Sequence, residues 1–419
     1  MYELSLLRSN RRFRALWAVE AADTVASGLA DVALPWFVLT VTGSPLGLGV
    51  AFALRSAPDV LVSPLVGGLI DRQPRSRLLA AGHAGTALLT ALLPALFSAG
   101  RLAAWELYAA MVGLSVTASL AHNTSRAALP GVVPEERLDP ANALLMGTRT
   151  GGRLVFLLAG GALTVAVGPA VVLAGAAGGS MLAAAAGRLS SLGSGGGDGG
   201  DGSLRRFRAG LGAISSRPTL LWLLALGVLY NAAVAPFGSV VFPATASALG
   251  GAGALTALLA CWRGGAAAGN ALAGRWSTPT GTKMASGAAV VGAGTLAAAG
   301  LLAAAPPALG PTARLALVAG ALLVAGLGQP LFNVPGSSLL QSAAPEGSRG
   351  TVVTAHNSLL QASFPVPLLA AGALLERLAP GLLLGAAGAG LLALAGLTAV
   401  ALDAPGWRAV RGPAAGGDE

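Results

Sequence analysis

The sequence predicts an all-α membrane protein in which twelve transmembrane helices form two pseudo-symmetric six-helix bundles. Three observations predict this fold class. Only 10% of the 419 residues are charged and 54% are hydrophobic, whereas a soluble domain carries about 25% charged residues. The apolar residues gather in twelve runs long enough to cross a bilayer. A glycine-rich segment divides these runs six and six.

The twelve runs are defined by length, since about 20 apolar residues at 1.5 Å of rise each are needed to cover about 30 Å of hydrocarbon. In the first half the expected spans are residues 13–41, 45–70, 78–98, 102–128, 141–166 and 168–187. In the second half they are residues 219–247, 252–275, 284–305, 312–341, 352–376 and 380–402.

The segment between the two halves contains the run GSGGGDGGDG followed by the basic run LRRFR. Glycine and serine offer no apolar surface to bury, so we expect a flexible cytoplasmic linker. The predicted organisation is a first bundle over 1–189, this linker over 190–217, a second bundle over 218–405 and a cytoplasmic tail over 406–419.

Basic residues predict the orientation in the membrane. With the N-terminus inside, nineteen of the 26 Lys and Arg residues fall on the cytoplasmic side, and only Arg101, Arg314 and Arg377 fall outside. Cytoplasmic loops carry an excess of Lys and Arg. We therefore expect both termini in the cytoplasm of a cell with a bacterial-type plasma membrane. No basic stripe with interleaved aromatic residues is present, so nucleic acid is not an expected partner.

The two halves also resemble each other in sequence. Asn123 begins the run NTSRAAL, and 210 residues later Asn333 begins NVPGSSL, each at the cytoplasmic end of the fourth span of its half. Arg55 in the second span likewise corresponds to Arg263 in the eighth. Together with the equal span counts, these matches favour a duplicated architecture.

The short cytoplasmic loop after the second span carries the most specific motif. Two glycines that allow close helix packing precede an acidic residue that can pair with a helix N-terminus or an arginine. The motif consists of Gly67, Gly68, Asp71, Arg72, Arg75 and Arg77. It resembles the loop signature of the major facilitator superfamily. The resemblance implies two six-helix halves and a gating loop that latches one conformational state.

Further motifs narrow this resemblance. The runs FRALW at 13–17, ALPWFVL at 33–39 and ALPGVVPEERL at 128–138 are similar to the drug/proton antiporter branch that includes macrolide and siderophore exporters. The resemblance implies a secondary active transporter that exports small amphipathic compounds by alternating access. Its energy source would be the proton gradient, with no cofactor or metal, and we expect it to work as a monomer in the lipid bilayer.

Charged residues inside the predicted spans point to a coupling site, because each is costly in hydrocarbon and normally faces the bundle interior or a water-filled cavity. Counting from the turn near Gly43 places Asp31 in the first span level with Arg55 in the second. Asp59 follows Arg55 by four residues and shares its helix face. We predict that these three side chains form one cluster.

A second cluster follows from the depth of the first and fifth spans, which both begin at the cytoplasm. Glu20 and Asp23 should lie near the depth of Arg149 and Arg153, so we predict that one of these carboxylates pairs with both arginines. A carboxylate whose arginine moves away would gain a proton, which couples protons to the conformational cycle. The alternative is that the pairs only fix helix register.

We expect Asp31 and Asp23 to be the leading proton carriers, with Glu20 and Asp59 as further candidates and with Arg55, Arg149 and Arg153 as their partners. Uncharged polar side chains in the spans are candidates for the substrate cavity, although hydrogen bonding between helices explains them equally well. These residues are Asn123, Asn231, Gln329, Asn333, Asn357 and Gln361.

The sequence lacks the motifs of other protein classes. The single lysine, Lys283, is not part of a phosphate-binding loop, and the sequence contains neither HExxH nor GxSxG, so we do not expect an enzyme. A solute importer or uniporter of the same fold remains the main alternative, because the fold does not specify direction. A membrane sensor or scaffold that transports nothing is the alternative from another class.

Overall fold

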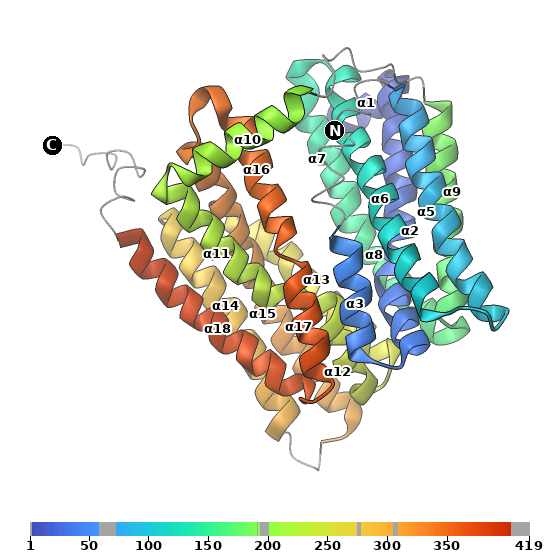
Figure 1. Ribbon diagram of the computed structural model, residues 1–419, viewed down its shortest axis with the longest axis vertical. Coiled ribbons are helices and arrows are strands. Elements are labelled where there is room, and N and C mark those ends of the chain that lie inside the picture. The colour runs from blue at the N-terminus through green and yellow to red at the C-terminus, as the bar shows by residue number, and fades with distance from the viewer. Residues whose placement is uncertain are drawn as a thin grey trace. The chain divides into compact units, whose positions relative to one another are not determined.

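The computed structural model describes residues 2–57, 73–190, 192, 201–274, 278–304 and 309–403. Within these residues every regular element is a helix (Figure 1). Ten helical segments are long and apolar enough to cross a membrane. The predicted all-α membrane fold is therefore confirmed. The count of twelve stays a prediction, because residues 58–72 of the expected second span lie outside the described part and the helix over the expected eighth span is not among the ten.

The chain divides into two compact units. The first contains Met1–Leu204, Gly238–Thr256 and Leu368–Glu376, and the second contains Arg205–Phe237, Ala257–Pro367 and Arg377–Glu419. In the N-terminal part of the first unit the helices are α1 (Tyr2–Ser9), α2 (Arg11–Thr42), α3 (Pro45–Ser56), α5 (Arg75–Ser98), α6 (Ala104–Ala128), α7 (Leu138–Gly147), α8 (Arg153–Val167) and α9 (Pro169–Leu189). Short turns η1 (Leu129–Gly131), η2 (Glu135–Arg137) and η3 (Thr148–Gly152) connect α6 to α8.

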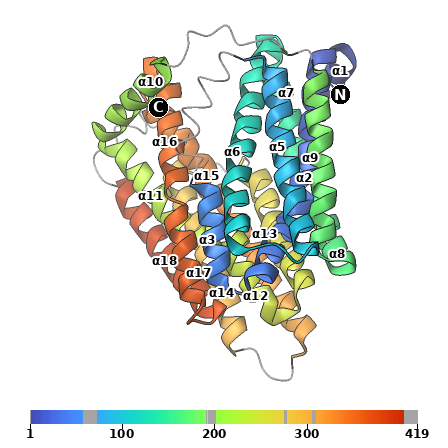
Figure 2. The same ribbon diagram turned by 45° about the vertical axis from the view of Figure 1, so that its right-hand side comes forward.

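Helix α2 is central to the first unit. Asn10 begins it, because its side-chain oxygen accepts hydrogen bonds from the backbone N–H groups of Arg12 and Phe13, both at 3.0 Å. α2 packs against α8 and α9, and α5 packs against α6 and α9 (Figures 1 and 2). A Cβ on Gly28 would lie 2.5 Å from the Cβ of Phe156, so this glycine allows α2 and α8 to approach closely.

Two segments from late in the chain complete the first unit. α12 (Phe242–Leu249) and the end of α17 (Pro365–Leu375) belong to it. A Cβ on Gly49 of α3 would lie 3.0 Å from the Cα of Gly372, so α3 and α17 are in backbone contact. Just beyond α17, Glu376 accepts hydrogen bonds from the Ser44 hydroxyl and from the Leu46 N–H, the latter at 3.0 Å. The carboxylate thereby caps the N-terminus of α3.

The second unit is built from long apolar helices. They are most of α10 (Asp201–Ser215) and α13 (Ala252–Ala273), together with α11 (Pro218–Val234), α14 (Thr280–Ala304), α15 (Pro311–Ala343), α16 (Arg349–Ala362), α18 (Pro380–Asp403) and the turn η5 (Glu346–Ser348). The turn η4 (Phe237–Val241) has only its first residue in this unit. α14 packs against both α15 and α18. A Cβ on Gly287 would lie 2.8 Å from the Gly328 carbonyl oxygen, so small residues set the α14–α15 distance.

Helix α10 corrects the prediction of a flexible linker over the whole of 190–217. Residues 201–215 are helical, and Phe207, Leu211 and Ile214 recur at helical spacing and provide an apolar stripe. Ile214 is buried, and a Cβ on Gly210 would lie 2.7 Å from the Thr351 carbonyl oxygen of α16. The basic composition hid this pattern.

Candidate functional site

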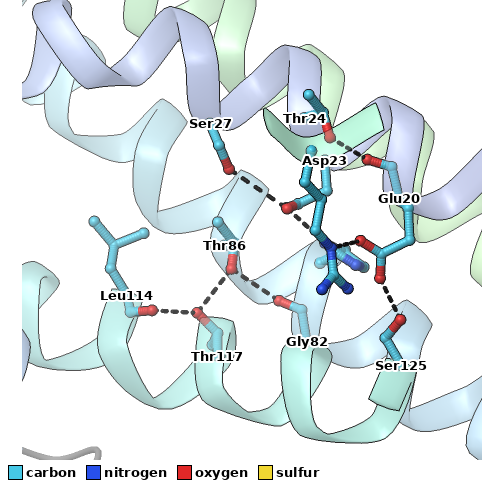
Figure 3. Close-up of polar contacts among 11 residues, drawn as sticks. Glu20, Asp23, Thr24, Ser27, Gly82, Thr86, Leu114, Thr117 and Ser125 are labelled. Atoms are coloured by element: carbon cyan, nitrogen blue, oxygen red, sulfur yellow. Dashed lines mark hydrogen bonds and ion pairs between the residues drawn. The ribbon is translucent and has the colours of Figure 1, made fainter. Parts of the chain in front are cut away.

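The candidate site lies within the first unit, where α2 carries three acidic side chains, Glu20, Asp23 and Asp31. Each of the three has a basic partner on another segment, and the three partners differ. Figure 3 shows Glu20 and Asp23 close together on α2, with Ser125 of α6 beside Glu20.

Glu20 is a buried carboxylate held by two donors. Nε of Arg149 donates to its Oε2 at 2.6 Å, and the Ser125 hydroxyl donates to its Oε1. Close by, Nε1 of Trp17 donates to the Thr148 hydroxyl at 3.0 Å, which ties α2 to the turn η3. The predicted pairing of Arg149 with a carboxylate of the first span is thus confirmed. Its role in coupling stays a prediction.

Asp31 pairs with Arg153 through two parallel bonds, from Nε to Oδ2 at 2.7 Å and from Nη2 to Oδ1 at 2.8 Å. The prediction had placed Arg153 with Glu20 or Asp23 and was wrong. Arg149 lies within the π-helical turn η3, and Arg153 begins α8 directly after it. A Cβ on Gly28 would lie 3.1 Å from the Arg153 carbonyl oxygen, so Arg153 starts beside Gly28 and its side chain reaches Asp31, about one turn further along α2.

Asp23 has a different kind of partner. Its Oδ1 lies 3.5 Å from Nδ1 of His83 on α5, and the Ser27 hydroxyl donates to its Oδ2 at 3.4 Å. The Asp23 side chain is 42% exposed, whereas that of His83 is 7% exposed. The prediction missed His83. A polar residue inside an expected apolar span was the available signal.

The three pairs differ chemically. Arginine stays protonated at every physiological pH, so the Glu20–Arg149 and Asp31–Arg153 pairs are permanent charges. Histidine changes its charge near neutral pH. The Asp23–His83 pair is therefore the one among these three whose basic member is not a permanently charged arginine.

Much of the predicted gating loop lies outside the described residues, namely Gly67, Gly68, Asp71 and Arg72, as does Asp59. Arg75 and Arg77 are described and form the first turn of α5. A Cβ on Gly131 would lie 3.1 Å from Nη1 of Arg75, so this arginine reaches the turn η1 after α6. Arg55 lies in the last turn of α3. The predicted roles of these residues stay untested.

The uncharged cavity candidates are spread over four helices. Asn123 lies on α6 in the first unit; Asn231 on α11, Gln329 and Asn333 on α15, and Asn357 and Gln361 on α16 lie in the second. Next to two of them, Tyr230 stacks on Phe332 with ring centroids 4.2 Å apart and an interplanar angle of 8°. This buried aromatic pair joins α11 to α15 and was not predicted. Among the described residues, no group of three His, Cys, Asp or Glu side chains could hold a metal ion.

Comparison with known families decides the relationship. The model of the Major Facilitator Superfamily matches residues 16–367. The chain belongs to the major facilitator superfamily. This membership points to a membrane transporter rather than to an enzyme.

The curated relatives of this facilitator include siderophore exporters. It is 33% identical over 179 residues to the enterobactin exporter EntS of Citrobacter koseri and 34% identical over 179 residues to that of Shigella boydii serotype 18. In both comparisons the match covers 41% of this chain and 41% of the exporter. The similar region therefore spans less than half the length of these relatives.

Several solved transporter structures share the facilitator's fold. The nucleoside transporter NupG matches with a TM-score of 0.74 at 11% identity, over 93% of this chain and 99% of that one. A peptide transporter POT in complex with sulfate matches with a TM-score of 0.72 at 12% identity, over 96% of both chains. A bacterial homologue of ferroportin in its inward-facing state matches with a TM-score of 0.67 at 16% identity, over 96% of this chain and 99% of that one. At these identities the likeness concerns the fold alone.

Proposed function

We propose that this transporter exports small amphipathic compounds of the drug or siderophore type, and that protons moving inward drive the export. The partial similarity to enterobactin exporters supports the direction and the substrate class. The observation that carries proton coupling is Asp23, an acidic side chain on a membrane helix that is 42% exposed and is paired with an imidazole. Ionisable side chains at such positions mark ion and proton pathways.

In the proposed cycle, Asp23 binds a proton on one side of the membrane and releases it on the other as the two halves alternate access. Glu20 and Asp31 serve as fixed charges that hold α2 against η3 and α8. Asp31 would carry a proton only if Arg153 moved away from it. The loop with Asp71 and Arg72 would stabilise one of the two states.

The same proposal sets the cellular context. The transporter works as a monomer in a bacterial-type plasma membrane with both termini in the cytoplasm. This orientation follows from the excess of Lys and Arg on that side.

Transport into proteoliposomes with an imposed pH gradient tests the proposal. Macrolides, lipophilic cations and siderophores are assayed with the wild type, Asp23→Asn and Asp31→Asn. Asp139→Asn is the matched control, because Asp139 is exposed in the first turn of α7. We expect gradient-driven transport at the full rate in the wild type and in Asp139→Asn. Asp31→Asn should transport at a reduced rate, and Asp23→Asn should lose gradient-driven transport.

Other outcomes identify the alternatives. Substrate movement in the direction of the proton flow would indicate an importer. Substrate movement that does not depend on the pH gradient would indicate a uniporter or another driving ion. Binding without any movement would indicate a sensor.

A further inference from the structure

We infer that the driving proton is held jointly by Asp23 and His83, with the exposed carboxylate exchanging protons with water and the buried imidazole sharing the proton behind it. This inference rests on the proposed proton-coupled export and adds to it a second proton-binding residue. It assigns His83 the role of a buried proton-binding group behind Asp23.

The first argument is geometric. Oδ1 of Asp23 and Nδ1 of His83 are 3.5 Å apart, so a small movement of either side chain brings them to hydrogen-bond distance. The exposed fraction falls from 42% at the Asp23 side chain to 7% at that of His83. Of the two groups, the carboxylate is therefore the one that is open to exchange with the surroundings.

The backbone around His83 packs closely against α6. A Cβ on the adjacent Gly82 would lie 2.9 Å from both the Ala121 N and the Thr117 carbonyl oxygen, so α5 and α6 are in contact there. One turn further, the hydroxyls of Thr86 and Thr117 are hydrogen-bonded at 3.0 Å (Figure 3). The segment of α5 that carries His83 is therefore held against α6 on both sides of this residue.

The other ionisable side chains around His83 are either neutralised by a partner, exposed, or placed elsewhere on the neighbouring helices. Glu20 lies close enough to interact with His83 electrostatically, but Arg149 neutralises it. His122 on α6 interacts with the same carboxylates and is an exposed residue. The remaining charged residues on the helices that pack around α5, and on α5 itself, are Glu106 and Arg126 on α6, Arg188 on α9, and Arg75 and Arg77.

The proton balance is simple. In the loaded state one proton lies between Oδ1 of Asp23 and Nδ1 of His83, while Nε2 keeps its own hydrogen. In the unloaded state Asp23 is a carboxylate and His83 a neutral imidazole. One proton is taken from water and returned to water in each cycle, and only O–H and N–H bonds form and break.

Histidine-selective ¹⁵N labelling tests this directly, because the chain has 3 His residues. Spectra of the full chain are recorded from pH 5 to pH 8, and His83→Gln assigns the His83 signal. We expect the His83 signal to titrate and its midpoint to fall by about 1 pH unit or more in Asp23→Asn. The midpoint should be unchanged in Asp139→Asn. A His83 signal that does not titrate, or whose midpoint ignores Asp23→Asn, overturns the inference.

A transport experiment separates this inference from the proposed function. His83→Gln should lose gradient-driven transport at least tenfold while keeping exchange of substrate in the absence of a gradient, and His122→Gln should keep both. Gradient-driven transport that persists in His83→Gln overturns the inference and leaves proton-coupled export standing. If transport by the wild type does not depend on the pH gradient, the proposed function is overturned. The labelling result then still decides whether Asp23 and His83 share a proton.

Discussion

Arg153 of α8 binds Asp31 of α2 through two parallel hydrogen bonds, at 2.7 and 2.8 Å. The planar guanidinium matches both carboxylate oxygens, so the pair fixes the rotation of one helix against the other as well as their distance. The Asp31 side chain is 9% exposed and that of Arg153 is 49% exposed. The pair thus has one buried end and one open end.

Removing the charge of Asp31 should destabilise the first unit. Asp31→Asn leaves Arg153 without its counter-charge, which costs about 1–3 kcal/mol because the arginine is half-exposed. Arg153→Lys should cost less, since it keeps the charge and loses the two-bond geometry. Melting temperatures in detergent measure both. The swapped double variant, Asp31→Arg with Arg153→Asp, should regain part of the loss; a swap no more stable than either single variant would count against a direct interaction.

Glu20 should be essential for the fold rather than for coupling. Glu20→Gln removes the charge opposite Arg149, and breaking such a buried pair costs about 3 kcal/mol. We expect a lower yield of folded protein and a lower melting temperature than in Asp23→Asn. Adding Arg149→Gln should recover part of the stability, because no unpaired charge then remains. A Glu20→Gln variant as stable as the wild type would contradict this role.

Gly28 should tolerate no side chain. In Gly28→Ala the new Cβ would lie 2.5 Å from the Cβ of Phe156 and 3.1 Å from the Arg153 carbonyl oxygen. Forcing α2 and α8 apart should cost about 1–3 kcal/mol and weaken the nearby Asp31–Arg153 pair. Gly175→Ala on α9 is the matched control, since open space surrounds its Cβ and alanine favours the helix. Equal melting temperatures for the two variants would contradict the close packing.

The cap on α3 should depend on pH. The hydroxyl of Ser44 and the N–H of Leu46 hold the pKa of Glu376 below its usual value. Because the folded-state pKa is lowered, the stabilisation is fully present above the usual pKa of about 4.3 and is lost as the pH falls through the lower folded value. The melting temperature of the wild type should exceed that of Glu376→Gln at pH 7 and match it at the acid end. Glu135→Gln, at an exposed residue, should show no such convergence.

Composition and apolar run length were sufficient to predict the membrane fold, because each span must be long and apolar whatever its neighbours are. The depth argument likewise predicted that Glu20 or Asp23 lies near Arg149, since the two spans begin at the same membrane face, and the structure shows Glu20 as the partner. It did not place Arg153, because counting from loop ends does not give the register of two packed helices, and packing sets Arg153 beside Gly28 and so within reach of Asp31.

What the sequence determined by itself was therefore the class of the protein, its helices and the presence of costly charges within them. The tertiary structure alone decided which charges meet. In the folded protein Asp31 pairs with Arg153 and Asp23 lies beside His83. Glu376, which is 332 residues beyond Ser44, binds the start of α3. Hydrophobic burial depends on composition along one helix, whereas an ion pair depends on the rotation and distance of two helices, which packing at residues such as Gly28 sets.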